Sequence, residues 1–201
     1  MYRHRSLAVV APPAAVLTVT EGKLRAGLDW IVGDPRDQLM ASFIAAATAK
    51  VEEDTGVALA PRTVDVFYDT LPRTYAVPLP LRPVSGVTFS SFDSSSIRVP
   101  LAGAIYALNS GSAAPVEASV QLIDADAWPA TLRAFQPWAI QIVAGFTTAA
   151  DIPPRLLHAV ALLVAHYATI GRDLVQIGHI VAETPLGYES IIAPYQLVAV
   201  G

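Results

Sequence analysis

The chain has 201 residues, a length typical of one large domain or two small ones. Hydrophobic residues make up 53% of it, enough for a sizeable core, whereas charged residues make up only 15%, below the ~25% of an average domain. A formal net charge of −4 argues against tight binding of nucleic acid through its phosphates. The lack of cysteine excludes disulfides, thiolate metal sites and cysteine nucleophiles. The low charge favours a protein that covers part of its surface with other protein, as an oligomer or an assembly component does.

The N-terminal residues, MYRHRSLAVVAPPAAV, have a basic start followed by a short apolar run. The run LAVVA is shorter than the apolar region of a signal peptide, so we expect an extended arm. The most apolar stretch of the chain, between Arg155 and Arg172, is too short to cross a bilayer and is interrupted by His158 and His166. The sequence therefore predicts no membrane segment.

The first helix is expected over about residues 19–31. Thr18 and Glu21 have the spacing of a capping box, in which the threonine accepts a hydrogen bond at the helix start and the glutamate reaches back. Asp34 followed by Pro35 then indicates the start of a second helix.

This second helix is expected over about residues 35–54, with Gly56 as its C-terminal cap. Three adjacent acids, Glu52, Glu53 and Asp54, fall in its last turn and point about 100° apart, so they cannot converge on one ion. We interpret them as a solvated helix end; the alternative is an ion pair with a neighbouring subunit. An apolar stripe recurs every four residues along the helix, Leu39, Phe43, Ala47 and Val51, and Met40 and Ile44 widen it.

Residues 62–146 change character and predict six or seven strands in a small antiparallel sheet or sandwich. Pro78, Pro80 and Pro83 indicate an edge strand or a loop around residues 78–83. Turn-forming Pro, Gly, Ser and Asn separate the expected strands, which include TVDVFYD, YAVPLPL, VSGVTFSSF, IYALN, VEASVQLI and AIQIVAGF.

A third long helix is expected over about residues 153–170. Apolar residues cover nearly its whole circumference, which is typical of a helix buried on all sides. One way to bury it is between its own fold and a neighbouring subunit; the other is as a central helix wrapped by the sheet. The first arrangement gives four candidates for a subunit interface: Leu156, Val160, Leu163 and Tyr167.

Candidate catalytic and metal-binding groups are sparse. His158 and His166 lie about 12 Å apart along the third helix, too far to share a metal ion. No HExxH, GxSxG or glycine-rich phosphate-binding motif occurs. Asp124 and Asp126, next to Trp128, have the composition of an acid pair acting on a sugar, but such a segment more often caps a turn. The sequence predicts no enzyme activity, no metal and no cofactor.

Several segments, taken in order, carry a resemblance to a known family. The closest match has a strand ending in Ala-Gly-aromatic, a short loop, Ile-Pro and then the apolar helix. In this order and spacing, the chain resembles the head–tail connector, or adaptor, proteins of long-tailed bacteriophages, prophages and phage-like gene transfer agents. The segments are LTVTEGKLRAGL (17–28), DQLMASFIAAATAKVEEDTGVAL (37–59), LPLRPVSGV (79–87), IQIVAGFTTAADIPPRLLHAVALLVAHY (140–167) and PLGYESIIAPYQ (185–196).

The order of the expected elements, helices followed by strands and then by helices, predicts an α+β fold. A helical bundle, the connector core, would come from residues 1–60 and 150–201. A β-rich insertion, an antiparallel sheet or sandwich, would occupy residues 61–149, between the second and third long helices.

The resemblance also implies a structural function without catalysis or cofactor. Such proteins form a ring, typically a dodecamer, beneath the portal protein in the neck of a virion that is assembled in the bacterial cytoplasm. The ring extends the DNA channel and docks the downstream stopper or tail connector protein, and DNA passes without sequence-specific binding. The alternative function is a small tail or baseplate binding module.

The C-terminal segment is the candidate portal contact, because in the family this end of the chain lies toward the portal. PLGYESIIAPYQLVAVG carries one charge, Glu189, and is too apolar to be left in water. A short helix over about residues 186–193 and an extended tail suit docking in a partner's groove. The alternative is that the segment packs on its own helices. The candidate contact residues are Leu186, Tyr188, Ile191, Ile192, Tyr195 and Leu197.

Overall fold

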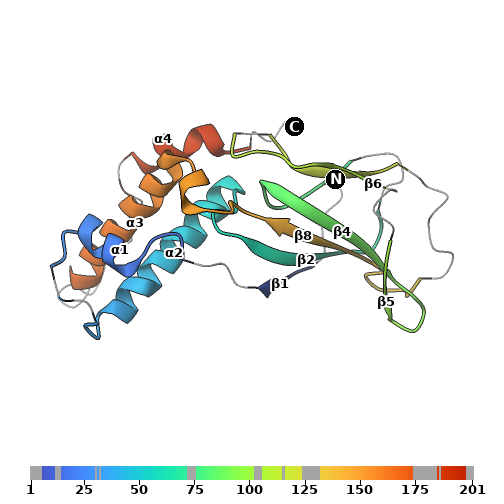
Figure 1. The fold of residues 1–201 in the computed structure, drawn as a ribbon, viewed down its shortest axis with the longest axis horizontal. Coiled ribbons are helices and arrows are strands. Elements are labelled where there is room, and N and C mark those ends of the chain that lie inside the picture. Colours follow the sequence, from blue (N-terminus) through green and yellow to red (C-terminus); the bar gives the residue numbers. More distant parts are fainter. Residues whose placement is uncertain are drawn as a thin grey trace. The chain divides into compact units, whose positions relative to one another are not determined.

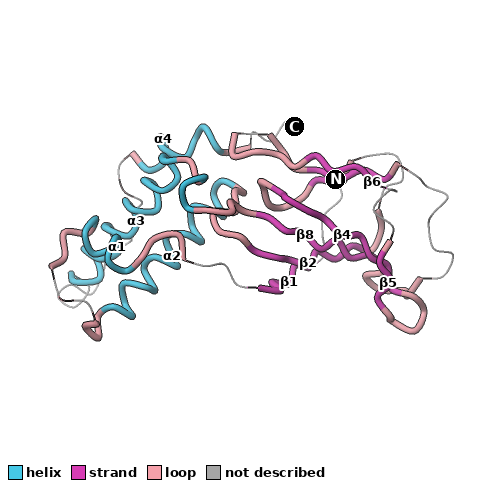
Figure 2. Tube along the Cα trace, viewed as in Figure 1, coloured by secondary structure: helices cyan, strands magenta, loops and turns pink. Residues whose placement is uncertain are grey.

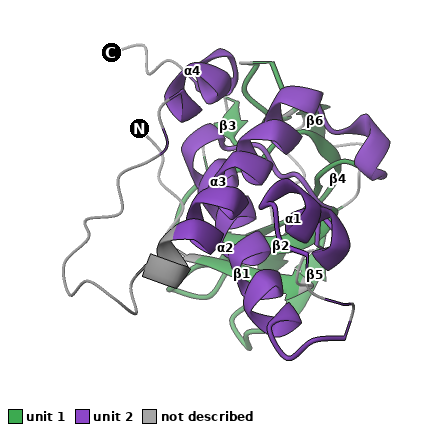
Figure 3. Cartoon of the chain, turned by 90° about the vertical axis from the view of Figure 1, so that its left-hand side faces the viewer, with its two compact units in different colours: residues 1–13, 61–146 green, residues 14–60, 147–201 purple. Residues whose placement is uncertain are grey.

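The fold is α+β, as expected. The computed structural model describes residues 6–11, 15–29, 31, 33–71, 76–101, 106–114, 116–123, 132–173, 185 and 187–197. These residues form four α-helices and two antiparallel β-sheets (Figures 1 and 2). The chain divides into two compact units: unit 1 contains residues 1–13 and 61–146, and unit 2 contains residues 14–60 and 147–201 (Figure 3).

The β-strands lie in unit 1 and form two sheets. The five-stranded sheet has the strand order β1-β2-β8-β4-β5, and the three-stranded sheet has the order β3-β7-β6. The strands are β1 (Ser6–Ala11), β2 (Arg62–Tyr68), β3 (Val77–Pro78), β4 (Val84–Phe92), β5 (Arg98–Pro100), β6 (Tyr106–Asn109), β7 (Ser119–Leu122) and β8 (Trp138–Ala144).

The N-terminal stretch, predicted as an extended arm, is extended over residues 6–11 but is paired with a strand of the sheet. Its apolar run forms strand β1, which pairs antiparallel with β2 and so becomes an edge of the larger sheet. Residues 1–13 therefore belong with the strands, whereas the sequence placed residues 1–60 entirely with the helices. Nothing in the sequence of this stretch indicates the distant strand with which it pairs.

One face of the five-stranded sheet is apolar and buried. Val66 of β2 and Phe89 of β4 both pair with Ile140 of β8, which places the three buried side chains in one row on that face. The Tyr106 ring of β6 lies 4.8 Å from the Phe89 ring, and the Tyr106 hydroxyl donates to the Val87 carbonyl (2.8 Å). The smaller sheet therefore packs on this face, and unit 1 has a two-sheet core.

The opposite face of the five-stranded sheet carries an ion pair. Asp65 of β2 accepts two hydrogen bonds from the Arg98 guanidinium of β5 (2.8 and 2.9 Å) and one from the Gln141 amide of β8 (3.3 Å). This bidentate geometry joins the edge strand β5 to β2, three places away in the strand order. Nearby, the Arg133 guanidinium lies 3.7 Å from the centre of the Phe92 ring.

Unit 2 contains the helices. Helix α3 contacts α1, α2 and α4, so its apolar circumference is buried among helices of its own unit. None of the helices in the described part of the chain combines the length and the apolar composition that a bilayer crossing needs. The helices are α1 (Val19–Arg25), α2 (Asp37–Thr55), α3 (Pro154–Asp173) and α4 (Tyr188–Ile192), with short 3-10 turns η2 (Ala149–Asp151) and η3 (Ala193–Tyr195).

The start of α1 and the end of α2 are where the sequence predicts them. The Glu21 N–H donates to Thr18 Oγ1 (3.2 Å), and the Thr18 N–H donates to the Glu21 carboxylate (2.8 Å), which confirms the capping box. Gly56 follows α2 with φ of +68°, a left-handed conformation that favours glycine.

The start of α2 is shifted from its prediction. Asp34 is not the residue that caps the helix: its carboxylate accepts from the Arg36 N–H (2.9 Å) and from the Arg36 guanidinium (2.8 Å). These bonds close a turn, and the helix begins at Asp37. Helix α1 likewise ends at Arg25 rather than near residue 31, because the chain turns at Gly27, whose φ is +64°.

Helix α1 approaches α2 closely at Gly22. A Cβ at this position would lie 3.0 Å from both Ile44 Cδ1 and Met40 Sδ, so any larger residue would push the two helices apart. Met40 and Ile44, rather than Leu39, are the buried residues at this contact, and Leu39 is 53% exposed. The apolar stripe predicted for α2, which included Met40 and Ile44, is therefore buried except at its N-terminal residue Leu39 and at the half-buried Phe43.

Candidate functional site

The expected acid pair Asp124 and Asp126, with Trp128, lies outside the described residues. The two histidines on α3 differ in burial: His158 is exposed and His166 is half-buried. Within the described ranges no three residues of the types His, Cys, Asp and Glu gather as metal ligands would. The absence of a metal and of a cofactor stays a prediction. The described residues with a possible function are those on surfaces that other proteins could contact.

The acidic end of α2 is an internal anchor rather than a solvated helix end. Glu52 is 7% exposed, and its carboxylate accepts a hydrogen bond from the Leu59 N–H (2.7 Å). After Gly56 the chain turns back along the helix, and residues 57–60 are buried there. Glu52 therefore holds this returning segment, and only Glu53 of the three acids is exposed as predicted.

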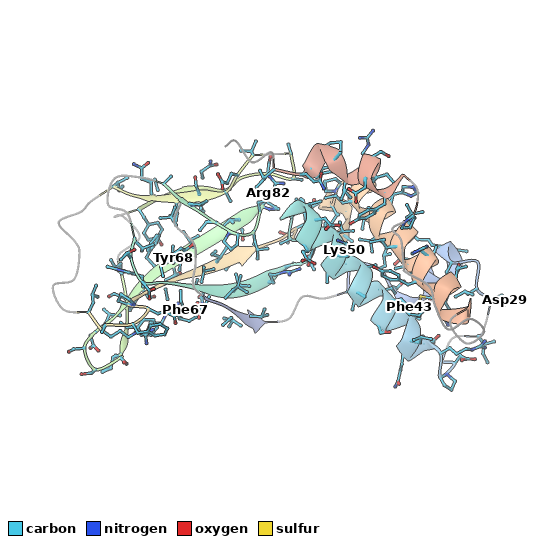
Figure 4. The ribbon with its side chains drawn as sticks, turned by 180° about the vertical axis from the view of Figure 1, so that it is seen from behind. Asp29, Phe43, Lys50, Phe67, Tyr68 and Arg82 are labelled. Atoms are coloured by element: carbon cyan, nitrogen blue, oxygen red, sulfur yellow. The ribbon has the colours of Figure 1, made fainter. Side chains whose placement is uncertain are left out.

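Asp54 joins α2 to the C-terminal helix. Its carboxylate forms an ion pair with Lys50 (2.6 Å), labelled in Figure 4, and accepts a hydrogen bond from the Tyr188 hydroxyl (2.7 Å). The hydrogen bond with Asp54 raises the pKa of Lys50. Burial, and then the bond to Asp54, raises the pKa of the Tyr188 hydroxyl. The solvated interpretation of Asp54 was wrong because its partner is contributed by a helix far along the chain.

Two of the six candidate portal-contact residues belong to the core of unit 2. The side chains of Tyr188 and Ile192 are fully buried, so they hold α4 against its own helices. Leu186 lies outside the described residues. Ile191 and Tyr195 are half-buried and Leu197 is exposed, so these three remain open to a partner. The expectation that this segment packs on its own helices is correct for the buried side of α4.

The candidate subunit-interface residues on α3 are also mostly internal. Leu156, Val160 and Leu163 are fully buried in the single chain, so they cannot present a surface to a neighbouring subunit. Tyr167 is half-buried, with its ring centre 6.4 Å from that of Phe43 on α2. Of the four candidates, Tyr167 alone keeps surface for a neighbour.

Unit 2 presents exposed apolar side chains at the turn between α1 and α2. Leu24, Ile31 and Leu39 are 80%, 81% and 53% exposed. The turn is held by Lys23, whose buried ammonium donates to the Ile31 carbonyl (3.2 Å) and pairs with the Asp37 carboxylate at the start of α2. We call these three residues the α1–α2 patch. Exposed large apolar side chains of this kind are suited to a protein contact.

Unit 1 presents a second exposed apolar set on β1. Leu7, Val9 and Val10 are 42%, 56% and 55% exposed on this edge strand. Sequence reasoning missed both sets because it assigned Leu39 to a buried stripe and the β1 residues to a free arm. The low charge of the whole chain was the one signal of exposed apolar surface.

No protein-family model matches the chain, and no curated protein matches it. A chain of the "Virion of native gene transfer agent (GTA) particle" is similar in structure, with a TM-score of 0.76 and 22% identity over 97% of both chains. A chain of the "Neck of empty GTA particle computed with C6 symmetry" has a TM-score of 0.77 and 22% identity over 98% of this chain and 97% of the other.

A third similar structure is a chain of the "Neck of native GTA particle computed with C12 symmetry", with a TM-score of 0.72 and 24% identity over 98% of this chain and 97% of that one. The matches run from end to end in both directions, so both units and their order along the chain are shared. At 22–24% identity, this likeness establishes the fold of the chain but not its function.

Proposed function

We propose that the chain is a structural head–tail adaptor in the neck of a tailed phage or phage-like particle. The observation that carries the proposal is the end-to-end structural match, 97% or more of each chain, to chains of gene transfer agent necks and virions. The C6 and C12 symmetries with which two of those necks were computed support a ring of identical copies. The exposed apolar sets on β1 and at the α1–α2 turn are suited to assembly.

Under this proposal the ring lies beneath the portal protein, extends the DNA channel and docks the downstream stopper or tail connector protein. A protein with this role needs stable surfaces rather than a reactive site. A net charge of −4 on each copy also suits a channel through which DNA slides instead of adhering.

The portal contact is assigned to the exposed side of the C-terminal segment, at Ile191, Tyr195 and Leu197. A charge at Ile191 or Tyr195 should prevent the protein from joining portal-bearing heads while leaving it folded, because neither side chain is fully buried. The matched control is Ala45→Glu on α2, an exposed position that the proposal leaves without a role. If the Tyr195→Glu and Ile191→Glu variants both join portal-bearing heads normally, the portal contact lies elsewhere on the protein.

The experiment that tests the function is removal of this chain from cells that make the particle, followed by electron microscopy. An adaptor predicts DNA-filled heads and complete tails that do not join, with joining restored by the added protein. Joined particles with a defective tail tip would instead support the tail or baseplate module and overturn the adaptor. Joined, normal particles would overturn both.

A further inference from the structure

The apolar face of the five-stranded sheet continues onto β1, where its side chains are exposed. Leu7 pairs with Val66 and Val9 pairs with Val64, so both side chains point to the same face as these two buried valines. The smaller sheet reaches this face at β4, through Tyr106, and two strands separate β4 from β1. Leu7 and Val9 therefore extend the rows of the core but remain exposed in the single chain.

Strand β1 offers a partner this face rather than its backbone edge. Its register against β2 shifts between Val9 and Ala11, and such a bulge interrupts the regular row of N–H and C=O groups that an added strand would need. Arg62 lies two residues from Val64 on β2, so its half-buried side chain points to the same face. We call Leu7, Val9 and Arg62 the β1 face. It has an apolar centre and a positive charge at one end.

The α1–α2 patch of unit 2 has the complementary chemistry. Its three side chains are apolar and exposed, and they are displayed by two helices that pack closely at Gly22. Asp29 lies between Leu24 and Ile31 in the sequence and is exposed as well (Figure 4). The patch therefore has an apolar centre with a carboxylate beside it.

The other charges of the turn are paired with one another. Lys23 pairs with Asp37, and the Arg36 guanidinium pairs with Asp34. These two ion pairs cancel locally, so Asp29 gives the turn a negative charge. This charge is opposite in sign to that of Arg62 on the β1 face.

We propose that the α1–α2 patch of one copy packs on the β1 face of the neighbouring copy in the ring, with Asp29 next to Arg62, an inference that rests on the proposed function. The contact would remove apolar side chains of both surfaces from water and bring unlike charges together.

Contact between unlike surfaces also satisfies the symmetry of a ring. Contact of either surface with its own copy has two-fold symmetry and closes at a dimer, whereas contact between two different surfaces repeats from one subunit to the next. Self-contact would in addition bring two arginines or two aspartates together, which is unfavourable.

Charge reversal tests the contact. Asp29→Arg and Arg62→Glu each place like charges opposite one another, so each should reduce ring formation and the joining of portal-bearing heads. The double variant restores unlike charges and should recover both. Glu53→Arg is the control, because this exposed acid lies on neither surface, and it should form rings normally. Circular dichroism checks that every variant is folded.

Disulfide cross-linking tests the same contact without changing a charge, since the chain has no cysteine of its own. Val9→Cys is combined in turn with a cysteine at 24, 31 or 39, and the protein is oxidised both free and on portal-bearing heads. Contact between copies predicts a ladder of linked chains on a non-reducing gel, rising to the size of the ring. Val9→Cys with Ala45→Cys is the control and should give no ladder.

The other outcomes overturn the contact. A linked monomer would show that the two surfaces meet within one chain, and a linked dimer from Val9→Cys alone would show that β1 meets β1. A ring that gives no links and tolerates both charge reversals would mean that these surfaces contact other proteins, and the proposed function would stand. If the protein forms no ring, alone or on portal-bearing heads, the proposed function fails and this contact fails with it.

Discussion

Replacing Tyr188 with phenylalanine should lower the free energy of unfolding by about 2 kcal/mol, because it removes one hydrogen bond and keeps the buried ring. The Tyr188 hydroxyl donates to Asp54 over 2.7 Å, and the residue is fully buried. A hydrogen bond to a charged acceptor contributes ~1.5–3 kcal/mol. Asp54 keeps its ion pair with Lys50 in the variant, which places the loss in the lower part of that range.

Tyr68 provides a matched control for the same substitution. It is buried in β2, and its hydroxyl has no hydrogen-bond partner among the described residues. Removing an unpaired buried hydroxyl relieves a desolvation cost, so Tyr68→Phe should leave stability unchanged or raise it by up to ~1 kcal/mol. Urea unfolding at pH 7, followed by far-UV circular dichroism, compares the two variants with the parent chain. Equal losses for both variants would refute the reasoning, as would a loss below ~0.5 kcal/mol for Tyr188→Phe.

Three further predictions follow from burial and hydrogen bonding. Leu163→Asp should abolish folding, because it places an unpaired charge in the core of unit 2, a cost of several kcal/mol; a soluble, cooperatively unfolding variant would contradict it. Glu52→Gln should lower stability by ~1–2 kcal/mol because it weakens the bond to the Leu59 N–H, whereas Glu53→Gln should change it by less than ~0.5 kcal/mol; equal effects in urea titrations would be inconsistent with this. Burial raises the pKa of Tyr68 to about 12, so stability present below pH 10 should fall as the pH rises toward 12. Tyr68→Phe should remove part of this alkaline loss in titrations monitored by circular dichroism.

Features set by neighbouring residues could be predicted from the sequence. The capping box joins Thr18 and Glu21, three residues apart, and the left-handed cap needs only Gly56. The α+β composition follows from segment-by-segment periodicity in the same way. These features depend on local backbone geometry, which a single sequence specifies directly.

Features set by distant partners could not be predicted. Asp54 and its partner Tyr188 are 134 residues apart, so nothing in the sequence around Asp54 indicates that Tyr188 bonds to it. The pairing of β1 with β2 also joins residues that are far apart in the sequence. Because this pairing was not predicted, the N-terminal residues were assigned to the helical part of the chain. The apolar content of α3 showed that it is buried, but not that its own unit buries it. Sequence patterns indicate which residues must be buried, and tertiary contacts determine which residues bury them.

A ring of identical copies needs two different contact surfaces on every copy, since each subunit meets one neighbour through one surface and the next neighbour through the other. Under the proposed function, the α1–α2 patch, an exposed apolar set on unit 2, is suited to one of these surfaces. Its rigid attachment through Lys23 suits that use, because a surface already ordered before binding loses little conformational entropy on contact.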